Sequence, residues 1–272
     1  MDKIGEYIRR IEIDSLWSGQ KHIVWELNRK VNILSGVNGV GKSTILNKVI
    51  LRLLQAVKEG CPAKPDVKLT YEPADAVTVR FDVVRSFDRP LVHSNLLEKL
   101  ADDRVATELD WQLYLLQRRF LDYQVNVGNR MIALLTSGDP EAREKAQAAA
   151  QARGQFQDMV DELFSETGKK IVRSSNEIQL EQFGEILSPY KLSSGEKQML
   201  VILLTVLVED RQPYVLFMDE PEISLHVEWQ QKLITLIRQL NPNVQIILTT
   251  HSPAMIMNGW MDAVTEVTDI TQ

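Results

Sequence analysis

The chain has 272 residues, 44% of them hydrophobic and 25% charged, so it can bury a substantial core as one large α/β domain or as a domain with an inserted lobe. Its formal net charge of −6 argues against a protein that coats nucleic acid non-specifically, because neutralising phosphates takes a surplus of Lys and Arg. Contact with nucleic acid through a local basic groove stays open, and Arg118-Arg119 and Lys169-Lys170 are the first places to look for it.

Cysteine usage and apolar runs indicate where the protein works. The single cysteine, Cys61, has no partner for an intramolecular disulfide, which favours a reducing cytoplasm. The N-terminus is too charged for a signal peptide. The longest apolar runs, at 199–208 and 214–218, are too short to span a bilayer, so we expect no direct membrane insertion.

The first ninety residues predict strands on either side of a glycine-rich loop. Alternating or continuous apolar residues predict strands at 6–14, 22–27, 31–35 and 75–85, with a polar loop at 18–20 joining the first two. After the third strand, apolar residues at helical spacing predict a helix from Ile45 to Val57.

The loop between that third strand and the helix predicts the ligand. Every fixed position of the pattern G-x-x-x-x-G-K-[ST] is matched by Gly36-Val37-Asn38-Gly39-Val40-Gly41-Lys42-Ser43-Thr44. The glycines let backbone N–H groups turn inward, and the following helix offers its positive N-terminal end to an anion. Lys42 can reach the β- and γ-phosphates, and the Ser43 hydroxyl can ligand Mg²⁺. We therefore expect a nucleoside triphosphate, ATP, with Mg²⁺.

The middle of the chain predicts a helical lobe. Residues 95–135 are rich in Leu, Asp, Glu and Arg, and 140–166 is a polar, alanine-rich stretch with an expected break at Gly154. The segment shows no sustained heptad and is too short and too broken for a long coiled-coil arm. Residues 172–182 predict one or two edge strands that lead back to the core.

The last eighty residues predict alternating helices and strands. Ser193 or Ser194 can cap a buried helix that begins near Gly195-Glu196. Further elements are expected as a wholly apolar strand at 214–218, a helix at 226–239, a strand at 245–249 and a short helix from Ala254. This alternation predicts a largely parallel sheet.

The strand at 214–218 ends in Asp219-Glu220. At this place in a phosphate-loop fold, the Asp219 carboxylate hydrogen-bonds the Mg²⁺ shell and the Glu220 carboxylate orients or activates the attacking water. Two carboxylates at a sheet edge are common by themselves. Downstream of a complete phosphate loop, they indicate hydrolysis of the nucleotide.

Three segments resemble ATP-binding-cassette (ABC) ATPases and occur in the order expected of that superfamily. Leu192 to Gln198 resembles the signature motif, Asp219 to His226 resembles Walker B plus the D-loop, and His251 matches the switch histidine. The resemblance covers roughly 4–58 and 186–260. It implies an α/β P-loop NTPase with the head architecture of an ABC ATPase: a largely parallel sheet, an antiparallel β subdomain and a helical insertion lobe.

The same resemblance implies one domain over residues 1–272. Its parts would be an N-terminal lobe with the phosphate loop (1–90), a helical insertion (91–168), and a lobe with the signature, Walker B, the D-loop and the switch histidine (169–272).

By the resemblance, the enzyme hydrolyses ATP to ADP and phosphate in a site shared by two subunits. The signature residues of one subunit dock on the γ-phosphate held by the other, so that ATP joins two heads in a homodimer or a higher multiple; these residues are Ser193, Ser194, Gly195 and Glu196. Lys42, Glu220 and His251 would be catalytic, and Ser43 and Asp219 would hold the metal. Hydrolysis then lets the heads separate.

Within the superfamily, Asn38, the Pro-Glu-Ile-Ser-Leu-His D-loop and Thr249-Thr250-His251-Ser252-Pro253 resemble the RecF/SMC/OLD branch more than transporters. Many OLD-like ATPases act in bacterial anti-phage systems beside a nuclease or toxin. The chain has no acidic cluster resembling the nuclease domain fused to OLD proteins, which implies a separate effector chain.

Two of the superfamily's usual positions stay undecided. The glutamine that helps to ligand Mg²⁺ has three candidates, Gln112, Gln117 and Gln124, and the aromatic that stacks on adenine has two, Trp17 and Trp25. Three other functions also stay open: the nucleotide-binding subunit of an ABC transporter, a DNA repair or recombination ATPase, and a binding module whose nucleotide is structural.

Overall fold

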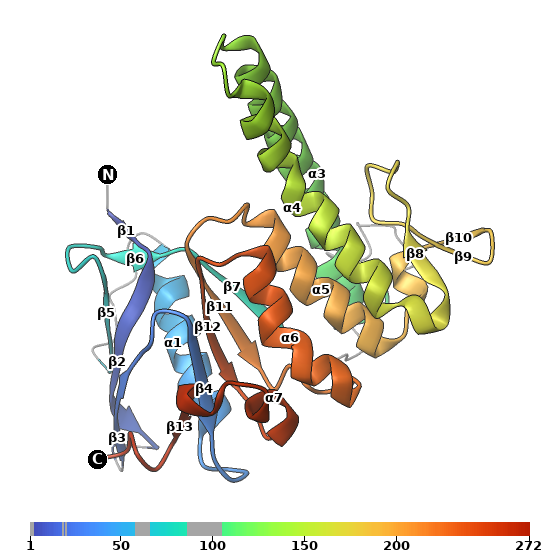
Figure 1. Cartoon of the computed structure of the whole chain (residues 1–272). Coiled ribbons are helices and arrows are strands. Elements are labelled where there is room, and N and C mark those ends of the chain that lie inside the picture. The colour runs from blue at the N-terminus through green and yellow to red at the C-terminus, as the bar shows by residue number, and fades with distance from the viewer. Residues whose placement is uncertain (1–2, 18, 20, 58–65, 86–104) are drawn as a thin grey trace.

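The computed structural model describes residues 3–17, 19, 21–57, 66–85 and 105–272 (Figure 1). Its centre is a five-stranded parallel sheet in the order β13-β4-β12-β11-β7. In that order, the strands span Val264–Glu266, Val31–Ser35, Val244–Thr249, Tyr214–Asp219 and Phe81–Arg85. Both faces of β11 and β12 are buried, which explains why these two sequences are nearly continuous apolar runs.

Two apolar layers cover the sheet. Along β11, Val215 and Phe217 pack with α1 (Lys42–Val57) and the N-terminal strands, whereas Leu216 and Met218 pack with α5 (Ser194–Val208) and α6 (Val227–Leu240). Successive side chains of a strand point to opposite faces, so one strand contributes to both layers. The functional loops therefore stand at the edge of a sheet that is fixed from both sides.

A second, antiparallel sheet covers α1 (Figure 1). Its order is β3-β2-β5, with strands at Lys21–Glu26, Tyr7–Leu16 and Val67–Glu72. The strands predicted at 6–14 and 22–27 are confirmed, whereas the sequence pattern missed β5. Residues 18 and 20 of the predicted loop, and Cys61, lie outside the described residues.

The single strand predicted at 75–85 is wrong. Thr78–Val79 forms β6, which pairs with β1 (Ile4–Gly5), whereas Phe81–Arg85 forms β7, which pairs with β11. The chain changes sheets at Arg80, and the alternation of apolar residues continues across that change because both strands bury one face.

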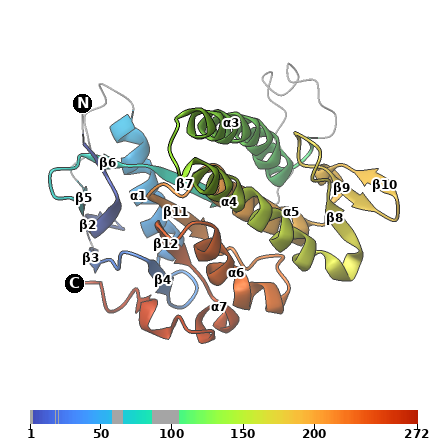
Figure 2. The ribbon, with the colours of Figure 1, turned by 45° about the horizontal axis from the view of Figure 1, so that its top comes forward.

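The predicted helical lobe is confirmed for the residues that the structure describes; residues 95–104 lie outside them. α3 (Glu108–Thr136) and α4 (Ala142–Leu163) form a hairpin that projects from the sheet (Figures 1 and 2). The break expected at Gly154 is wrong, because α4 continues through it. An interior glycine costs only about 1 kcal/mol relative to alanine, and the burial of Ala152, Phe156 and Val160 against the core offsets that cost.

The remaining elements surround α5. A three-stranded antiparallel sheet consists of β8 (Lys169–Ile171), β9 (Leu180–Gln182) and β10 (Glu185–Leu187), so the edge strands predicted over 172–182 are right only for β9. The helices and strands predicted after Ser193 are confirmed, ending with α7 (Pro253–Met257). Single 3₁₀ turns lie at Ser165–Thr167, Pro189–Lys191 and Met261–Ala263.

No helix in the described part of the chain combines the length and the apolar character that crossing a bilayer requires.

Candidate functional site

The predicted phosphate loop joins β4 to the first turn of α1. Gly39 and Gly41 have φ values of +79° and +106°, a region that L-residues rarely occupy. Asn38 and Gly39 are exposed at the tip of the loop, Val40 is half-buried and Thr44 is exposed in the first turn of α1. Glycine is thus required at the sharp turns of the loop, as the motif predicts.

Lys42 lies inside this loop with only 4% of its surface exposed. Its Nζ donates to the carbonyl oxygens of Gly36 (2.9 Å) and Val37 (3.2 Å). Burial lowers the pKa of Lys42, and the carboxylates of Glu220 and Asp219 oppose that shift. The ammonium group is therefore held at the centre of the loop, within the electrostatic reach of the acidic residues at the end of β11.

The residues predicted to hold Mg²⁺ are in direct contact. The Ser43 Oγ donates to Asp219 Oδ1 at 2.9 Å, and the Thr249 Oγ1 donates to the same oxygen at 2.5 Å. β4, β12 and β11 are parallel neighbours, with Leu34 paired to Thr249 and Thr249 paired to Asp219, so all three chain segments end at one edge. A hydroxyl and a carboxylate oxygen form a set of hard oxygen donors that fits Mg²⁺.

Glu220 and His251 meet beside this cluster. The His251 Nε2 lies 3.1 Å from Glu220 Oε1, and the two side chains are 35% and 25% exposed. Glu220 has a φ of +48°, which is uncommon for a residue with a Cβ. Its N–H donates to the Thr249 carbonyl and hydroxyl oxygens, both at 3.1 Å. The surrounding hydrogen bonds thus hold a strained backbone that brings the carboxylate to the imidazole.

The signature segment caps α5. Ser193, not Ser194, is the N-cap: its hydroxyl accepts from the Glu196 N–H, and the Glu196 carboxylate accepts from the Ser193 N–H. Burial acts to raise the pKa of Glu196, but hydrogen bonds from Lys169 and Ser193 outweigh it, so the pKa is lowered overall. In the described part of the chain, no hydrogen bond of Ser193 or Glu196 reaches the phosphate loop.

Gly195 packs against the D-loop. A Cβ on Gly195 would lie 2.4 Å from the carbonyl oxygen of Ser224, closer than real Cβ atoms approach another atom. Ser224 itself has a φ of +71°. The glycine of the signature is therefore required by its own chain, in addition to the docking role that the family resemblance implies.

The two tryptophans considered for stacking on adenine lie in different environments. Trp25 is buried and donates its Nε1 hydrogen to Thr265, so it belongs to the core. Trp17 is 40% exposed and lies beside the phosphate loop, where a Cβ on Gly41 would be 3.1 Å from its ring. Trp17 alone of the two borders the predicted nucleotide site.

The three candidate glutamines hold the helical lobe in place. Gln112 exchanges hydrogen bonds with the backbone of Arg85, Gln117 with that of Ile178, and Gln124 donates to the Asn176 carbonyl. None of these bonds identifies a metal ligand, so the candidates stay undecided.

The two basic pairs proposed for nucleic acid are partly used elsewhere. Arg119 is paired with Asp82 and Glu209, and Lys169 is paired with Glu196 at 2.9 Å. Cations held by carboxylates are poorly available to phosphates, so of these four positions Arg118 and Lys170 are the ones left for contact with nucleic acid.

Several polar residues of the site were not predicted. Thr249 joins Asp219 to Glu220, and Glu222 holds the backbone of His251. The sequence carried a signal for Thr249, because a threonine at the end of an apolar strand points to the same sheet edge as Asp219. The role of Glu222 depends on tertiary contacts that no spacing predicts.

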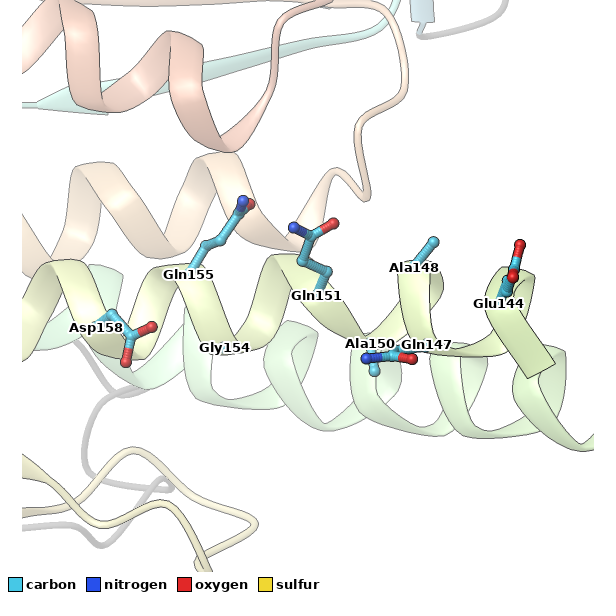
Figure 3. Close-up of a pocket in the computed structure, with 8 residues that line it drawn as sticks. All are labelled: Glu144, Gln147, Ala148, Ala150, Gln151, Gly154, Gln155 and Asp158. Carbon is cyan, nitrogen blue, oxygen red and sulfur yellow. The ribbon is translucent and has the colours of Figure 1, made fainter.

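One hollow on the described surface lies away from these residues. It has a volume of about 710 Å³ and is lined by residues of α4, among them Gln151, Gln155 and Asp158 (Figure 3). The hollow is shallow and contains none of the predicted nucleotide residues, so we assign it no role.

With this geometry established, comparisons with known proteins identify the family. The protein-family model described as "AAA domain, putative AbiEii toxin, Type IV TA system" matches residues 82–257, more than half of the chain. The chain belongs to this AAA domain family. The matched segment contains β11, the D-loop and His251, and the phosphate loop precedes it.

Individual relatives cover different shares of this AAA domain protein. Septu protein PtuA of Bacillus thuringiensis is 26% identical over 297 residues, covering 92% of the chain and 72% of PtuA. The phosphate import ATP-binding protein PstB of Thermococcus kodakarensis is 24% identical over 252 residues, covering 88% of the chain and 79% of PstB. The Retron Vc95 probable ATPase of Vibrio cholerae is 34% identical over 84 residues, only 16% of its own length.

Among solved structures, an SMC head bound to the C-terminal winged-helix domain of ScpA superposes with a TM-score of 0.51 and 14% identity. The match covers 93% of this chain and 91% of that one. The likeness concerns the fold alone. Together with the family, it confirms the predicted fold class, an α/β P-loop ATPase fold that resembles an SMC head.

Proposed function

We propose that this AAA domain protein binds ATP with Mg²⁺, hydrolyses it, and uses the nucleotide as a switch between separate and joined heads. The observation that carries the proposal is the cluster at one sheet edge: Lys42 inside the phosphate loop, Ser43 hydrogen-bonded to Asp219, and His251 3.1 Å from Glu220. We treat the chain as one domain with the three lobes predicted from its sequence, 1–90, 91–168 and 169–272.

Each residue of the cluster has a role in this proposal. The phosphate loop and Lys42 bind the phosphates, and Ser43 and Asp219 hold Mg²⁺, which would neutralise charge on the β- and γ-phosphates. The Glu220 carboxylate takes a proton from the attacking water, and the His251 imidazole orients the water and the γ-phosphate. Trp17, at the edge of the loop, stacks on adenine.

The proposed partner of one head is a second head. The signature residues Ser193 to Glu196 of one head dock on the nucleotide of another, so ATP holds two heads together. The similarity to Septu PtuA and to a retron ATPase, both from bacteria, supports a role in anti-phage defence, in which the cytoplasmic ATPase controls a separate nuclease or toxin chain.

A transporter subunit is the second candidate function, favoured by the similarity to PstB over most of both chains. The D-loop Pro-Glu-Ile-Ser-Leu-His and the α3–α4 hairpin favour the SMC-like switch instead. Fractionation with membranes in the native host would support the transporter reading.

The direct test is steady-state ATP hydrolysis. We expect Glu220→Gln to bind ATP but to lower kcat by about 10²–10⁴, the usual contribution of a general base. Lys42→Ala should weaken ATP binding, and omission of Mg²⁺ should abolish turnover. Glu228→Gln, an exposed acidic residue in the first turn of α6, and Lys30→Ala, an exposed lysine before β4, are matched controls. Unchanged hydrolysis by Glu220→Gln would refute the assignment.

A further inference from the structure

The segment that carries His251 is attached to the D-loop by one carboxylate. Glu222 Oε1 accepts a hydrogen bond from the Thr250 hydroxyl at 2.6 Å and another from the His251 N–H at 2.8 Å. Thr250 is fully buried, and its hydroxyl also accepts from the Ser252 N–H at 2.9 Å. Hydrogen bonds to a carboxylate are about twice as strong as neutral ones, so Glu222 fixes the backbone of His251 firmly.

A second side chain spans the same two segments. Gln230, in the first turns of α6, donates through Nε2 to the carbonyl oxygens of Leu225 (2.9 Å) and Glu222 (3.4 Å). Its Oε1 accepts from the Ser252 hydroxyl at 2.6 Å. One amide therefore uses both its donor and its acceptor to join the D-loop to the residue that follows His251.

The opposite side of the D-loop is in contact with the signature. The Ser224 carbonyl oxygen occupies the space that a Cβ on Gly195 would need, and Leu225 is buried in the main core. The D-loop is thus packed between the start of α5 and the His251 segment. A displacement of the D-loop cannot leave His251 in place without breaking the bonds of Glu222 and Gln230.

We propose that Glu222 and Gln230 are positioning residues for ATP hydrolysis: they hold the His251 imidazole against Glu220, so that the state of the D-loop sets the geometry of the catalytic pair. This inference rests on the proposed ATPase function and adds to it. Neither residue needs to touch the nucleotide. Their effect passes through the backbone of His251 and the 3.1 Å contact between its Nε2 and Glu220 Oε1.

The contacts determine which substitutions separate a positioning role of Glu222 and Gln230 from a merely structural one. Both bonds of Glu222 use Oε1 as an acceptor, so Glu222→Gln keeps an oxygen that can accept them, whereas Glu222→Ala removes it. Thr250→Val keeps the shape of the buried side chain but removes both the donor to Glu222 and the acceptor for the Ser252 N–H. Gln230→Glu keeps the acceptor for Ser252 and removes the donor to the D-loop carbonyls.

The test compares kcat and KM for ATP, with the melting temperature of each variant measured alongside. We expect Glu222→Ala and Thr250→Val to lower kcat substantially, up to about 10²-fold because small misplacements of catalytic groups have that effect, with KM little changed. Glu222→Gln should regain most of the lost kcat. Glu228→Gln, on the same helix as Gln230 and exposed, serves as the control that keeps wild-type kinetics.

A double variant decides whether the effect passes through His251. In a His251→Ala protein, adding Glu222→Ala should slow hydrolysis no further, because interacting residues are not additive. If Glu222→Ala slows both backgrounds equally, or leaves kcat of the folded wild-type background unchanged, the inference is overturned. If the wild type itself shows no Glu220-dependent hydrolysis, the proposed function fails instead, so the two failures are distinguishable.

Discussion

At the scale of single residues, the backbone around Glu220 shows how the site is held together. Its φ of +48° is sustained by two hydrogen bonds to Thr249, whose hydroxyl also donates to Asp219. One hydroxyl therefore sets both the proposed metal ligand and the proposed general base. A threonine can do this because its hydroxyl acts as donor and acceptor at once.

Replacing Thr249 with valine should separate this role from packing, since the two side chains have nearly the same shape. We expect Thr249→Val to lower kcat about 10- to 100-fold through misplacement of Glu220, and to cost about 1–3 kcal/mol of stability, because the buried groups lose their partner. Kinetics and urea unfolding would measure the two effects. Thr136→Val, which removes an exposed hydroxyl at the end of α3, should change neither; kcat unaffected by Thr249→Val would disprove the role.

At the scale of elements, two groups of ion pairs connect the base of the helical hairpin to the ATPase core. Lys197, within the signature segment at the start of α5, pairs with Asp110 at the start of α3 at 2.8 Å, and both are buried. Further along α3, Arg119 pairs with Asp82 of β7 and with Glu209 after α5. A movement of the hairpin would therefore be transmitted to the start of α5, next to Gly195.

The ion pairs of Arg119 with Asp82 and Glu209 predict that the stability lost on Arg119→Ala depends on pH. Burial and the neighbouring Asp82 raise the pKa of Glu209, and Arg119 counteracts that shift, so Arg119→Ala should raise the pKa further. Because Arg119 is 39% exposed, Arg119→Ala should lower the free energy of unfolding at pH 7.5 by about 1–3 kcal/mol, less than the loss of a fully buried pair.

The sign of the pH effect follows from the raised pKa. A carboxyl with a folded-state pKa above its unfolded value binds a proton more readily when folded, so protonation at low pH removes the repulsion between Glu209 and Asp82. The stability deficit of Arg119→Ala should therefore shrink as the pH falls from 7.5 to 5. Arg118→Ala, whose partner is the Tyr114 hydroxyl, is the control. A deficit that stays constant with pH would contradict the account.

Elements with a strong local pattern were predictable, and those defined by tertiary pairing were not. Short continuous apolar runs identified β11 and β12, because both faces of these strands are buried. β5 was missed although Val67, Leu69 and Tyr71 alternate with polar residues, and the change of sheet at Arg80 was missed because the apolar alternation continues across it. The break assigned to Gly154 failed because packing outweighed a weak local preference.

At the scale of the whole molecule, the order of the motifs predicted both the fold class and the composition of the site. Ser43, Asp219 and Thr249 are separated by up to about two hundred positions in the sequence, yet they meet because parallel strands place their carboxyl ends at one edge. The polar links that orient His251 were not predicted, because Glu222 and Gln230 act through contacts between loops.

We propose that ATP joins two heads, and the molecular mass of the protein in solution tests this most directly. Glu220→Gln would be measured by light scattering with and without ATP and Mg²⁺, beside Glu228→Gln and the double variant Lys42→Ala/Glu220→Gln. The account predicts that ATP doubles the mass of Glu220→Gln, because bound ATP is not hydrolysed, and leaves the double variant unchanged. A Glu220→Gln protein that binds ATP with no change in mass would contradict it.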